Sequence, residues 1–400
     1  MRPSARSAVP PFAVMEILTA ANALRAAGVR VLNLCVGEPS AAAPEPVRRR
    51  AAELLATGGP GYTEAVGLPA LRAALAVHYR RWYGVDVDPR RIAVTTGSSG
   101  GFLLAFLAAF EAGDRVAVTR PGYPAYRNIL ASLGVEVVEL PCGPATGYRP
   151  TVEQLDALDR PVHGLVVAGP ANPTGTVVDT AGLAALVGWC ADHDVRLVSD
   201  EIYHGITYGP AGPGSTAGGV PGTSPGAPTA AGDLDTGALV VSSFSKYWAM
   251  TGWRLGWLVL PDDLVDPVAA LAGNLALCPP ALAQHAALAA FTDEAYRAAD
   301  AEVAGYARSR AVVLDRLPDL GWARAAPADG AFYVYADLSP TGLDSPTWCR
   351  RLLAEAGVAL TPGTDFDPVD GRDWVRLSFA AGVEVVAEAL DRVVDWQRRL

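Results

Sequence analysis

The sequence is poor in charge and contains no long apolar or basic run. Only 18% of its 400 residues are charged, and the formal net charge is −10. No cluster of basic residues is large enough to follow a phosphate backbone, which argues against nucleic acid as a partner. The most apolar stretch, residues 101–110, is closed by Glu111 and is too short to cross a bilayer, so we expect no membrane segment.

Cysteine and histidine are also scarce. The five cysteines are scattered and form no Cys-x-x-Cys pair, so the sequence indicates neither a disulfide framework nor a zinc site. The five histidines show no metal-ligand spacing; His204 alone is placed to lie near a site, and packing or surface placement is the better explanation for all five. Pro10, Pro11 and Glu16 interrupt any secretory signal, and we expect a cytoplasmic protein without a metal.

The middle of the chain has the pattern of an α/β protein. Between about residues 90 and 260, short β-branched runs alternate with longer stretches rich in alanine and leucine, which predicts strand–helix units on a mostly parallel sheet. The carboxyl ends of such strands form the ligand crevice, so functional residues should gather there. The predicted strands cover residues 91–97, 114–121, 164–170, 195–200, 238–244 and 255–260.

The two ends of the chain have a different character. Residues 11–28 predict an amphipathic helix that ends at Gly28, and from about Gln284 long helices surround a short strand at residues 330–338. The stretch from Gly209 to Gly232 lacks periodicity and large apolar residues, which predicts a flexible surface excursion between two strands.

Polar residues that can carry chemistry follow two of the predicted strands. Lys246 lies just after an apolar strand, where desolvation lowers the pKa of an amine and lets it form a Schiff base; the competing interpretation is a surface lysine on a loop. Asp200 and Glu201 end another strand, with Tyr203 after them. A carboxylate there can hold a positively charged ring nitrogen, or it can simply cap the next element.

Two turns carry further candidates. Asn172 lies in an Asn-Pro-Thr-Gly turn that can aim its amide into the crevice, although such turns are also common without a function. Ser98 and Ser99 follow a strand and open an apolar helix, so their backbone amides can bind a phosphate. Neither the P-loop nor the dinucleotide glycine pattern is present, and this phosphate signal alone is unspecific.

An aromatic and a cationic residue complete the candidates. Tyr123 lies in a rigid turn after a strand, where its face can stack on a flat ring or serve packing alone. Arg376 lies on an otherwise apolar strand, where a guanidinium is suited to gripping a carboxylate or to forming an internal salt bridge.

Taken together and in this order, these residues resemble the class I/II aminotransferases of fold type I, the pyridoxal-phosphate enzymes that include aspartate aminotransferase. The match covers nearly the whole chain, and its stretches are VGEPS, GYTEAVGLPALRAAL, TTGSSGG, PGYPAY, NPTG, DEIY, SSFSKYWAMTGWRLGW, PGTDFD and VRLSFA. The resemblance implies an α/β fold with a large domain (45–284) around a mostly parallel seven-stranded sheet. A smaller α+β domain would combine an N-terminal arm and helix (1–44) with the C-terminal part (285–400).

The resemblance also assigns roles around pyridoxal 5′-phosphate. Lys246 would form the Schiff base with the cofactor and then shuttle a proton as general base and acid. Asp200 would pair with the ring nitrogen and keep the ring an electron sink. Tyr203 and Asn172 would bind the ring's phenolic oxygen, and Tyr123 would stack on the ring.

Phosphate binding and assembly follow from the same resemblance. The phosphate would be held by the backbone amides of Ser98 and Ser99, by the Ser243 hydroxyl and by Arg254. Tyr62 matches a tyrosine that reaches the phosphate of the neighbouring subunit, which implies a homodimer with shared active sites.

The substrates are expected to be an amino acid and a 2-oxo acid such as 2-oxoglutarate or pyruvate. Arg376 would grip the α-carboxylate, with the Gly37 backbone and Asn172 nearby. After the Gly-Glu-Pro motif, residues 40–42 are Ser-Ala-Ala, where the family often has an acidic and a bulky residue. Because no second arginine can be assigned to a side-chain carboxylate, a neutral or apolar donor is favoured.

Other outcomes remain open on this scaffold. The same residues serve β-lyases, amino-cyclopropane-carboxylate synthases and oxidases, which share the α-carbanion and differ in how it is quenched. A non-catalytic ligand-binding homologue is a further alternative, and the intact Lys246, Asp200, Tyr203, Arg254 and Arg376 argue against it.

Overall fold

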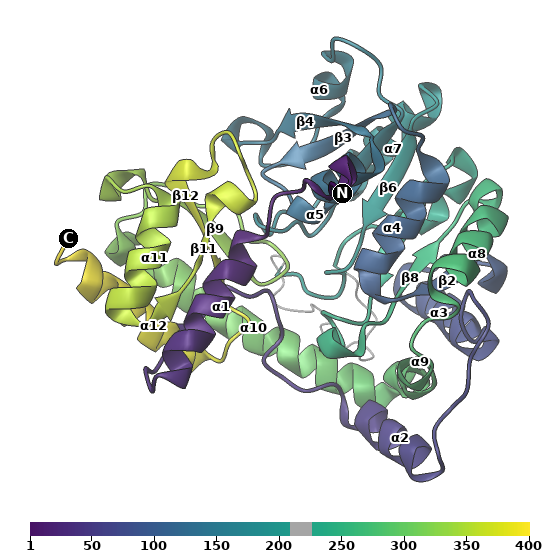
Figure 1. Ribbon diagram of the computed structural model, residues 1–400, viewed down its shortest axis with the longest axis horizontal. Coiled ribbons are helices and arrows are strands. Elements are labelled where there is room, and N and C mark those ends of the chain that lie inside the picture. The colour runs from purple at the N-terminus through teal and green to yellow at the C-terminus, as the bar shows by residue number, and fades with distance from the viewer. Residues whose placement is uncertain (209–225) are drawn as a thin grey trace.

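A seven-stranded sheet forms the centre of the larger part of the molecule (Figure 1). The computed structural model describes residues 1–208 and 226–400. The strand order is β2-β8-β7-β6-β5-β3-β4, and only the pairings of β8 are antiparallel, which confirms the expected mostly parallel sheet. The strands are β2 (Ile92–Thr95), β3 (Arg115–Arg120), β4 (Glu136–Pro141), β5 (Gly164–Ala168), β6 (Arg196–Asp200), β7 (Leu239–Ser243) and β8 (Gly256–Val259).

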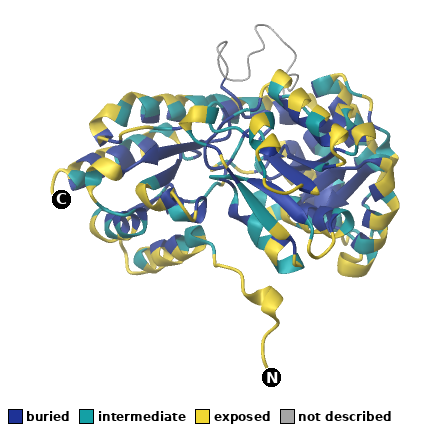
Figure 2. Ribbon diagram, turned by 90° about the horizontal axis from the view of Figure 1, so that it is seen from above, coloured by how far each residue is buried: buried dark blue, intermediate teal, exposed yellow. Residues whose placement is uncertain are grey.

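Helices cover both faces of this sheet, which is why its inner strands consist mainly of apolar residues. In β3, Val116 and Val118 pack in one cluster with α4, α5 and α8, whereas Ala117 packs in the other cluster with α3 and α7. Figure 2 shows the strands buried between exposed outer helix faces. The helices of this part are α2 (Glu45–Ala56), α3 (Pro69–Tyr83), α4 (Gly97–Ala109), α5 (Pro124–Leu133), α6 (Val152–Asp156), α7 (Thr180–Asp192), α8 (Asp262–Ala276) and α9 (Ala281–Ala287).

The sequence predicted six of the seven strands and missed β4. This strand lies at the edge of the sheet and carries Glu136 and Glu139, which interrupt the apolar run that marked the others. Both carboxylates are paired with arginines of neighbouring segments, Glu136 with Arg115 and Glu139 with Arg120. Charged residues on an edge strand prevent pairing with further strands, which explains why β4 lacks the continuous apolar run of the other strands.

The two ends of the chain come together in a second, smaller layer of structure. A three-stranded antiparallel sheet has the order β11-β12-β9, and β1 pairs in parallel with β10, which ties the N-terminal segment to the C-terminal part. The predicted N-terminal helix is present as α1 (Ala13–Ala26). The domain boundaries at residues 44 and 284 remain predictions. The other elements are β1 (Leu32–Asn33), α10 (Asp293–Leu320), β9 (Tyr333–Asp337), α11 (Ser345–Ala356), β10 (Val358–Ala359), β11 (Thr361–Pro362), β12 (Trp374–Ser378) and α12 (Val383–Gln397).

The predicted surface excursion is wrong for its last part. Residues 209–225 lie outside the described residues, but Ala230 and Ala231 are buried. The Ala230 N–H donates to Glu201 Oε1 at 2.8 Å, and the Thr229 hydroxyl donates to Glu201 Oε2 at 2.7 Å. These small residues resemble a loop in the sequence, but they belong to the hydrophobic core, and the backbone of Ala230 binds a buried carboxylate.

Arginine is the main cation on the outside of the molecule. In the part of the chain that the structure describes, every ion pair between side chains uses arginine or histidine, for example Arg91 with Asp262 at 2.6 Å.

None of the helices within residues 1–208 and 226–400 has the length and hydropathy of a bilayer-spanning segment. The same residues hold no group of three or more side chains suited to a metal ion, and their cysteines are all free.

Candidate active site

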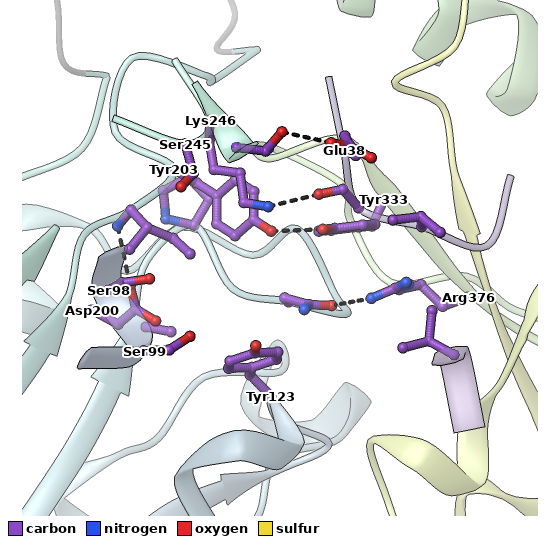
Figure 3. Close-up of a pocket in the computed structure, with 18 of the residues that line it drawn as sticks. Glu38, Ser98, Ser99, Tyr123, Asp200, Tyr203, Ser245, Lys246, Tyr333 and Arg376 are labelled. Atoms are coloured by element: carbon purple, nitrogen blue, oxygen red, sulfur yellow. Dashed lines mark hydrogen bonds between the residues drawn. The ribbon is translucent and has the colours of Figure 1, made fainter. Parts of the chain in front are cut away.

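A cavity of about 380 Å³ opens where the carboxyl ends of the sheet strands face the smaller layer (Figure 3). All but two of the predicted site residues line it, and they lie on or after the strands β1, β2, β3, β5, β6, β7 and β12. We call this space the active-site cavity. Its predicted members are Gly37, Ser98, Ser99, Tyr123, Asn172, Asp200, Tyr203, Lys246, Arg254 and Arg376.

Lys246 projects into the active-site cavity from the turn after β7. Its Nζ donates to the Gly37 carbonyl oxygen at 2.6 Å. Burial, together with the positive charge of Arg376, lowers the pKa of Lys246 to about 8. A far larger fraction of this amine than of an ordinary lysine is therefore neutral and nucleophilic at physiological pH. Lys246 is also the only lysine in the sequence, a count that would have singled it out before any motif did.

Asp200 ends β6 at the floor of the cavity. The Tyr126 hydroxyl and the Ile202 N–H donate to its carboxylate, the latter at 3.1 Å. Burial raises the pKa of Asp200 to about 6, against the opposing effect of the hydrogen bond from Tyr126. A cation placed against this carboxylate would favour its ionised form. Tyr126 was not predicted as a site residue, although it lies three residues after Tyr123 in the first turn of α5.

The N-terminus of α4 and Arg254 form an anion site on one side of the cavity. The helix begins at Gly97, so the N–H groups of Ser98 and Ser99 belong to the first turn, which has no intrahelical acceptors for them. A Cβ at Gly97 would lie 2.5 Å from Arg254 Nη2, and Gly97 has a φ of +67°. Arg254 Nη1 is held in turn by the Thr251 carbonyl oxygen at 2.8 Å. The absence of a side chain at Gly97 thus lets the guanidinium approach the helix end.

This geometry predicts the effect of Gly97→Ala. The added methyl group should displace the Arg254 guanidinium and raise the dissociation constant for a phosphate-bearing ligand by at least about tenfold, the effect of losing one charged hydrogen bond. Equilibrium titration of the cofactor-free protein measures it. Gly84→Ala is the matched control, because Gly84 has a φ of +68° with nothing within 4 Å. Both variants should lose about 1–2 kcal/mol of stability to backbone strain, and equal ligand affinities would contradict the anion site.

Arg376 lies on the opposite side of the cavity, on β12. It is buried, and its Nη1 donates to Asn172 Oδ1 at 2.9 Å. Its Nη2 donates to the Cys35 carbonyl oxygen and to Thr361 Oγ1. Among the described residues no carboxylate forms a salt bridge with Arg376, so the internal salt bridge that the sequence left open is not observed there. A buried guanidinium with neutral partners is suited to pairing with a carboxylate from a ligand.

Tyrosines occupy the space between these groups. The Tyr203 hydroxyl lies 2.6 Å from the Tyr333 hydroxyl, and both side chains are buried. The ring of Tyr123 is stacked with that of Phe12 at 6.3 Å between centroids, and Tyr123 lines the cavity at the start of α5. Tyr333 was not predicted as a site residue, because its place in an apolar strand indicates only that it is buried.

Two predicted site residues do not line the cavity. Ser243 is buried, and its hydroxyl bonds with Ser245 and with the Leu255 carbonyl oxygen, while Ser245 itself lines the cavity. Tyr62 is 84% exposed. Their roles in phosphate binding remain predictions. His204 is buried between Tyr83 and the Gly169 carbonyl oxygen, as expected for a packing residue.

Comparison with known proteins gives the site its context. Residues 29–393 match the family model described as aminotransferase class I and II. The chain belongs to this family. It is 51% identical over 395 residues to the valine–pyruvate aminotransferase of Mycobacterium tuberculosis, a match that covers 99% of this chain and 98% of that protein. It is 36% identical over 390 residues to the aspartate/prephenate aminotransferase of Thermus thermophilus, with 96% of each chain covered.

The solved structures agree with the sequence comparison. The crystal structure of an aminotransferase from Mycobacterium tuberculosis superimposes with a TM-score of 0.93 at 50% identity and covers 100% of both chains. The recognition made from the motifs is therefore confirmed, and the fold is that of the fold type I aminotransferases. The protein is a pyridoxal-phosphate-dependent aminotransferase that acts on an amino acid and a 2-oxo acid.

The active-site cavity fits pyridoxal 5′-phosphate on independent grounds. An anion site, a buried carboxylate and an amine of lowered pKa face one cavity, and these match the phosphate, the ring nitrogen and the aldehyde of the cofactor. The close approach of Arg254 to Gly97 leaves a cradle that a side chain at position 97 would fill. No metal is needed to account for any of these groups.

Proposed function

We propose that this aminotransferase takes a neutral, aliphatic amino acid as donor and a small 2-oxo acid such as pyruvate as acceptor. The observation that carries the proposal is the set of cations in the cavity. The described residues that line it include Lys246, Arg254 and Arg376 as the only lysine and arginines. If these serve the cofactor aldehyde, the phosphate and the α-carboxylate, none of them is left for a second carboxylate.

Apolar side chains around the cavity support the same proposal. Val14 and Met15 of α1 line it together with Val36, and burying an aliphatic side chain against them is favourable. The relative from Mycobacterium tuberculosis, named for valine and pyruvate, supports a donor of this class. The segment after the Gly-Glu-Pro motif agrees with this. It consists of Ser40 and two alanines, with no charged side chain.

The roles that we propose for the cavity residues follow from their atoms. Bound pyridoxal phosphate supplies an electron sink that stabilises a carbanion at the substrate α-carbon. Lys246 Nζ would hold the cofactor aldehyde, then accept the α-proton and return it, which suits an amine with a pKa of about 8. Asp200 would hold the ring nitrogen in its protonated form, and Tyr203 would donate to the phenolic oxygen.

Substrate orientation would come from the opposite wall. Arg376 would bind the α-carboxylate through its fork, with its Nη1 kept in place by Asn172. The Gly37 carbonyl oxygen, which accepts from Lys246 Nζ at 2.6 Å, would hold the amine until it reacts. The substrate would thus lie between a fixed carboxylate site and a single amine.

Steady-state kinetics with a donor panel tests the substrate proposal. With pyruvate as acceptor, valine and leucine should give kcat/KM values at least about 100-fold above that of aspartate, because a buried carboxylate without a partner costs several kcal/mol. Glutamate is a second acidic donor for the panel, and its reaction is followed through the formation of 2-oxoglutarate. A higher kcat/KM for aspartate than for valine would overturn the proposal, and Lys246→Ala gives the background rate.

We also propose that the enzyme is a homodimer with shared active sites in the cytoplasm. Tyr62 is exposed on the single chain, and other large apolar side chains, Leu55, Leu275 and Leu277, are more than half exposed as well. Covering such residues with a second copy would be favourable. A particle mass of twice 41.6 kDa in light scattering is expected, and a mass of 41.6 kDa would contradict the dimer.

A further inference from the structure

Tyr333 lies at the meeting point of the two halves of the active site. It is the first residue of β9, which pairs along its length with β12, the strand that carries Arg376. Its side chain is 1% exposed although it lines the cavity. The centroid of its ring is 4.5 Å from Arg376 Cζ, so the ring face covers the guanidinium. The ring quadrupole attracts a cation held in this position.

The hydroxyl group of Tyr333 points the other way, to the cofactor side. It lies 2.6 Å from the Tyr203 hydroxyl, and Figure 3 marks this hydrogen bond with a dashed line. Among the described residues neither hydroxyl has another hydrogen-bond partner, and the two rings meet edge to face with their centroids 5.7 Å apart. Because a hydroxyl has a single proton, a bond donated by Tyr333 leaves the Tyr203 proton available for an acceptor in the cavity.

The backbone of Gly37 is shaped around the same hydroxyl. A Cβ at Gly37 would overlap the Tyr333 hydroxyl, so this position accepts only glycine while Tyr333 is in place. The carbonyl oxygen of Gly37 accepts from Lys246 Nζ. Tyr333 therefore contacts the residue that holds the reactive amine as well as Tyr203 and Arg376.

From these contacts we propose that Tyr333 is a positioning residue that links the cofactor side of the active site to the carboxylate side. Its hydroxyl orients the Tyr203 proton toward the phenolic oxygen of the cofactor, and its ring fixes the plane of Arg376 for the substrate carboxylate. The inference rests on the roles proposed above for Tyr203 and Arg376. Hydrogen bonds in a chain polarise one another, so losing the first bond weakens the second.

Two substitutions separate the two functions of the side chain. Tyr333→Phe removes the hydroxyl and keeps the ring over Arg376. Tyr333→Leu removes both. A weaker bond to the phenolic oxygen leaves more negative charge there, so the linkage between Lys246 and the cofactor keeps its proton to a higher pH. In Tyr333→Phe we expect the midpoint of the pH-dependent change in cofactor absorbance to rise by about 0.5 to 1 pH unit.

Binding of an unreactive substrate analogue reports the carboxylate side. 2-Methylalanine has an α-carboxylate but no α-proton, so its dissociation constant is independent of turnover. Tyr333→Phe should leave this constant within about twofold of wild type, whereas Tyr333→Leu should raise it about tenfold by releasing the guanidinium. Affinity of the cofactor-free protein for pyridoxal phosphate should fall about threefold or more in both variants.

Tyr335→Phe is the matched control for these measurements. Tyr335 lies on the same strand, is equally buried, and its hydroxyl has no hydrogen-bond partner among the described residues. The same chemical change there should leave the absorbance midpoint and the 2-methylalanine affinity unchanged. Thermal unfolding of each variant confirms that it is folded at the assay temperature.

A double substitution makes the test decisive. Tyr203→Phe should shift the midpoint in the same direction as Tyr333→Phe, and the double variant should shift it no further than Tyr203→Phe alone, because the two hydroxyls act as one chain. Equal midpoints in wild type and Tyr333→Phe, or additive shifts, would overturn the proposal. A wild-type protein with normal cofactor absorbance that prefers aspartate would overturn the substrate proposal alone, whereas one without any cofactor absorbance would overturn both.

Discussion

Lys246→Ala is expected to lower kcat for transamination by about 10⁴-fold or more. The substitution removes both the amine that binds the cofactor aldehyde and the group that moves the α-proton, and general acid–base catalysis alone contributes up to about 10⁴-fold. No other lysine exists in the chain to replace it. The measurement is the rate of 2-oxo acid formation at saturating donor, together with the absorbance of the bound cofactor.

Two further observations distinguish lost chemistry from lost structure. Borohydride reduction followed by mass measurement of a peptide digest should place one cofactor on the Lys246 peptide in wild type and none on that peptide in Lys246→Ala. Added ethylamine should restore part of the activity of Lys246→Ala, because a small amine fits the space left by the side chain. Lys246→Arg fills that space with a group that stays protonated, and it should not be restored. An active, unmodified Lys246→Ala would contradict the role of this residue.

Asp200→Asn should lower kcat by roughly 10²-fold to 10⁴-fold, although the new side chain has nearly the same shape as the carboxylate. The carboxylate is buried at the end of β6 and accepts from Tyr126 and Ile202, so the amide can occupy the same place but cannot balance a protonated ring nitrogen. Removing one partner of a buried ion pair costs about 3–5 kcal/mol, which corresponds to this range of rates. The loss should fall on kcat more than on the KM of the donor.

Glu201→Gln provides the matched control for the charge at position 200. Glu201 is the next residue and is also buried, but it does not line the cavity, and its carboxylate binds Ser199, Thr229 and Ala230. Loss of its charge should change thermal stability and leave kcat within a few-fold of wild type. A similar loss of kcat in both variants would show that the effect at Asp200 is structural.

The sequence predicted best those elements and site residues that can be recognised from the residues next to them in the chain. The strands buried on both faces are continuous apolar runs, and the groups at their carboxyl ends are polar or small, so β3, β5, β6 and β7 and the cavity residues after them could be read directly. Lys246 and Arg254 stand out because a charged residue in such surroundings needs a chemical reason.

Residues whose partners are distant in the sequence were missed. Tyr126 binds Asp200 across 74 positions and Tyr333 binds Tyr203 across 130 positions, and neither tyrosine carries a local mark that separates it from a packing residue. The same holds for Ala230, whose backbone N–H binds Glu201 from a stretch that resembles a loop in the sequence. Such contacts are created by the fold, so a single sequence shows the residue without its partner.

The preference for arginine over lysine limits unwanted reactions between the protein and free pyridoxal phosphate. Of the 32 lysine and arginine side chains one is lysine, and nearly all ion pairs of the described residues are built with guanidinium groups. Aldehydes condense readily with amines, whereas a guanidinium that stays protonated is a poor nucleophile. The protein can therefore be stored in a large excess of free pyridoxal phosphate with little adventitious labelling of its side chains. Its cofactor stoichiometry then reports occupancy of the catalytic position directly.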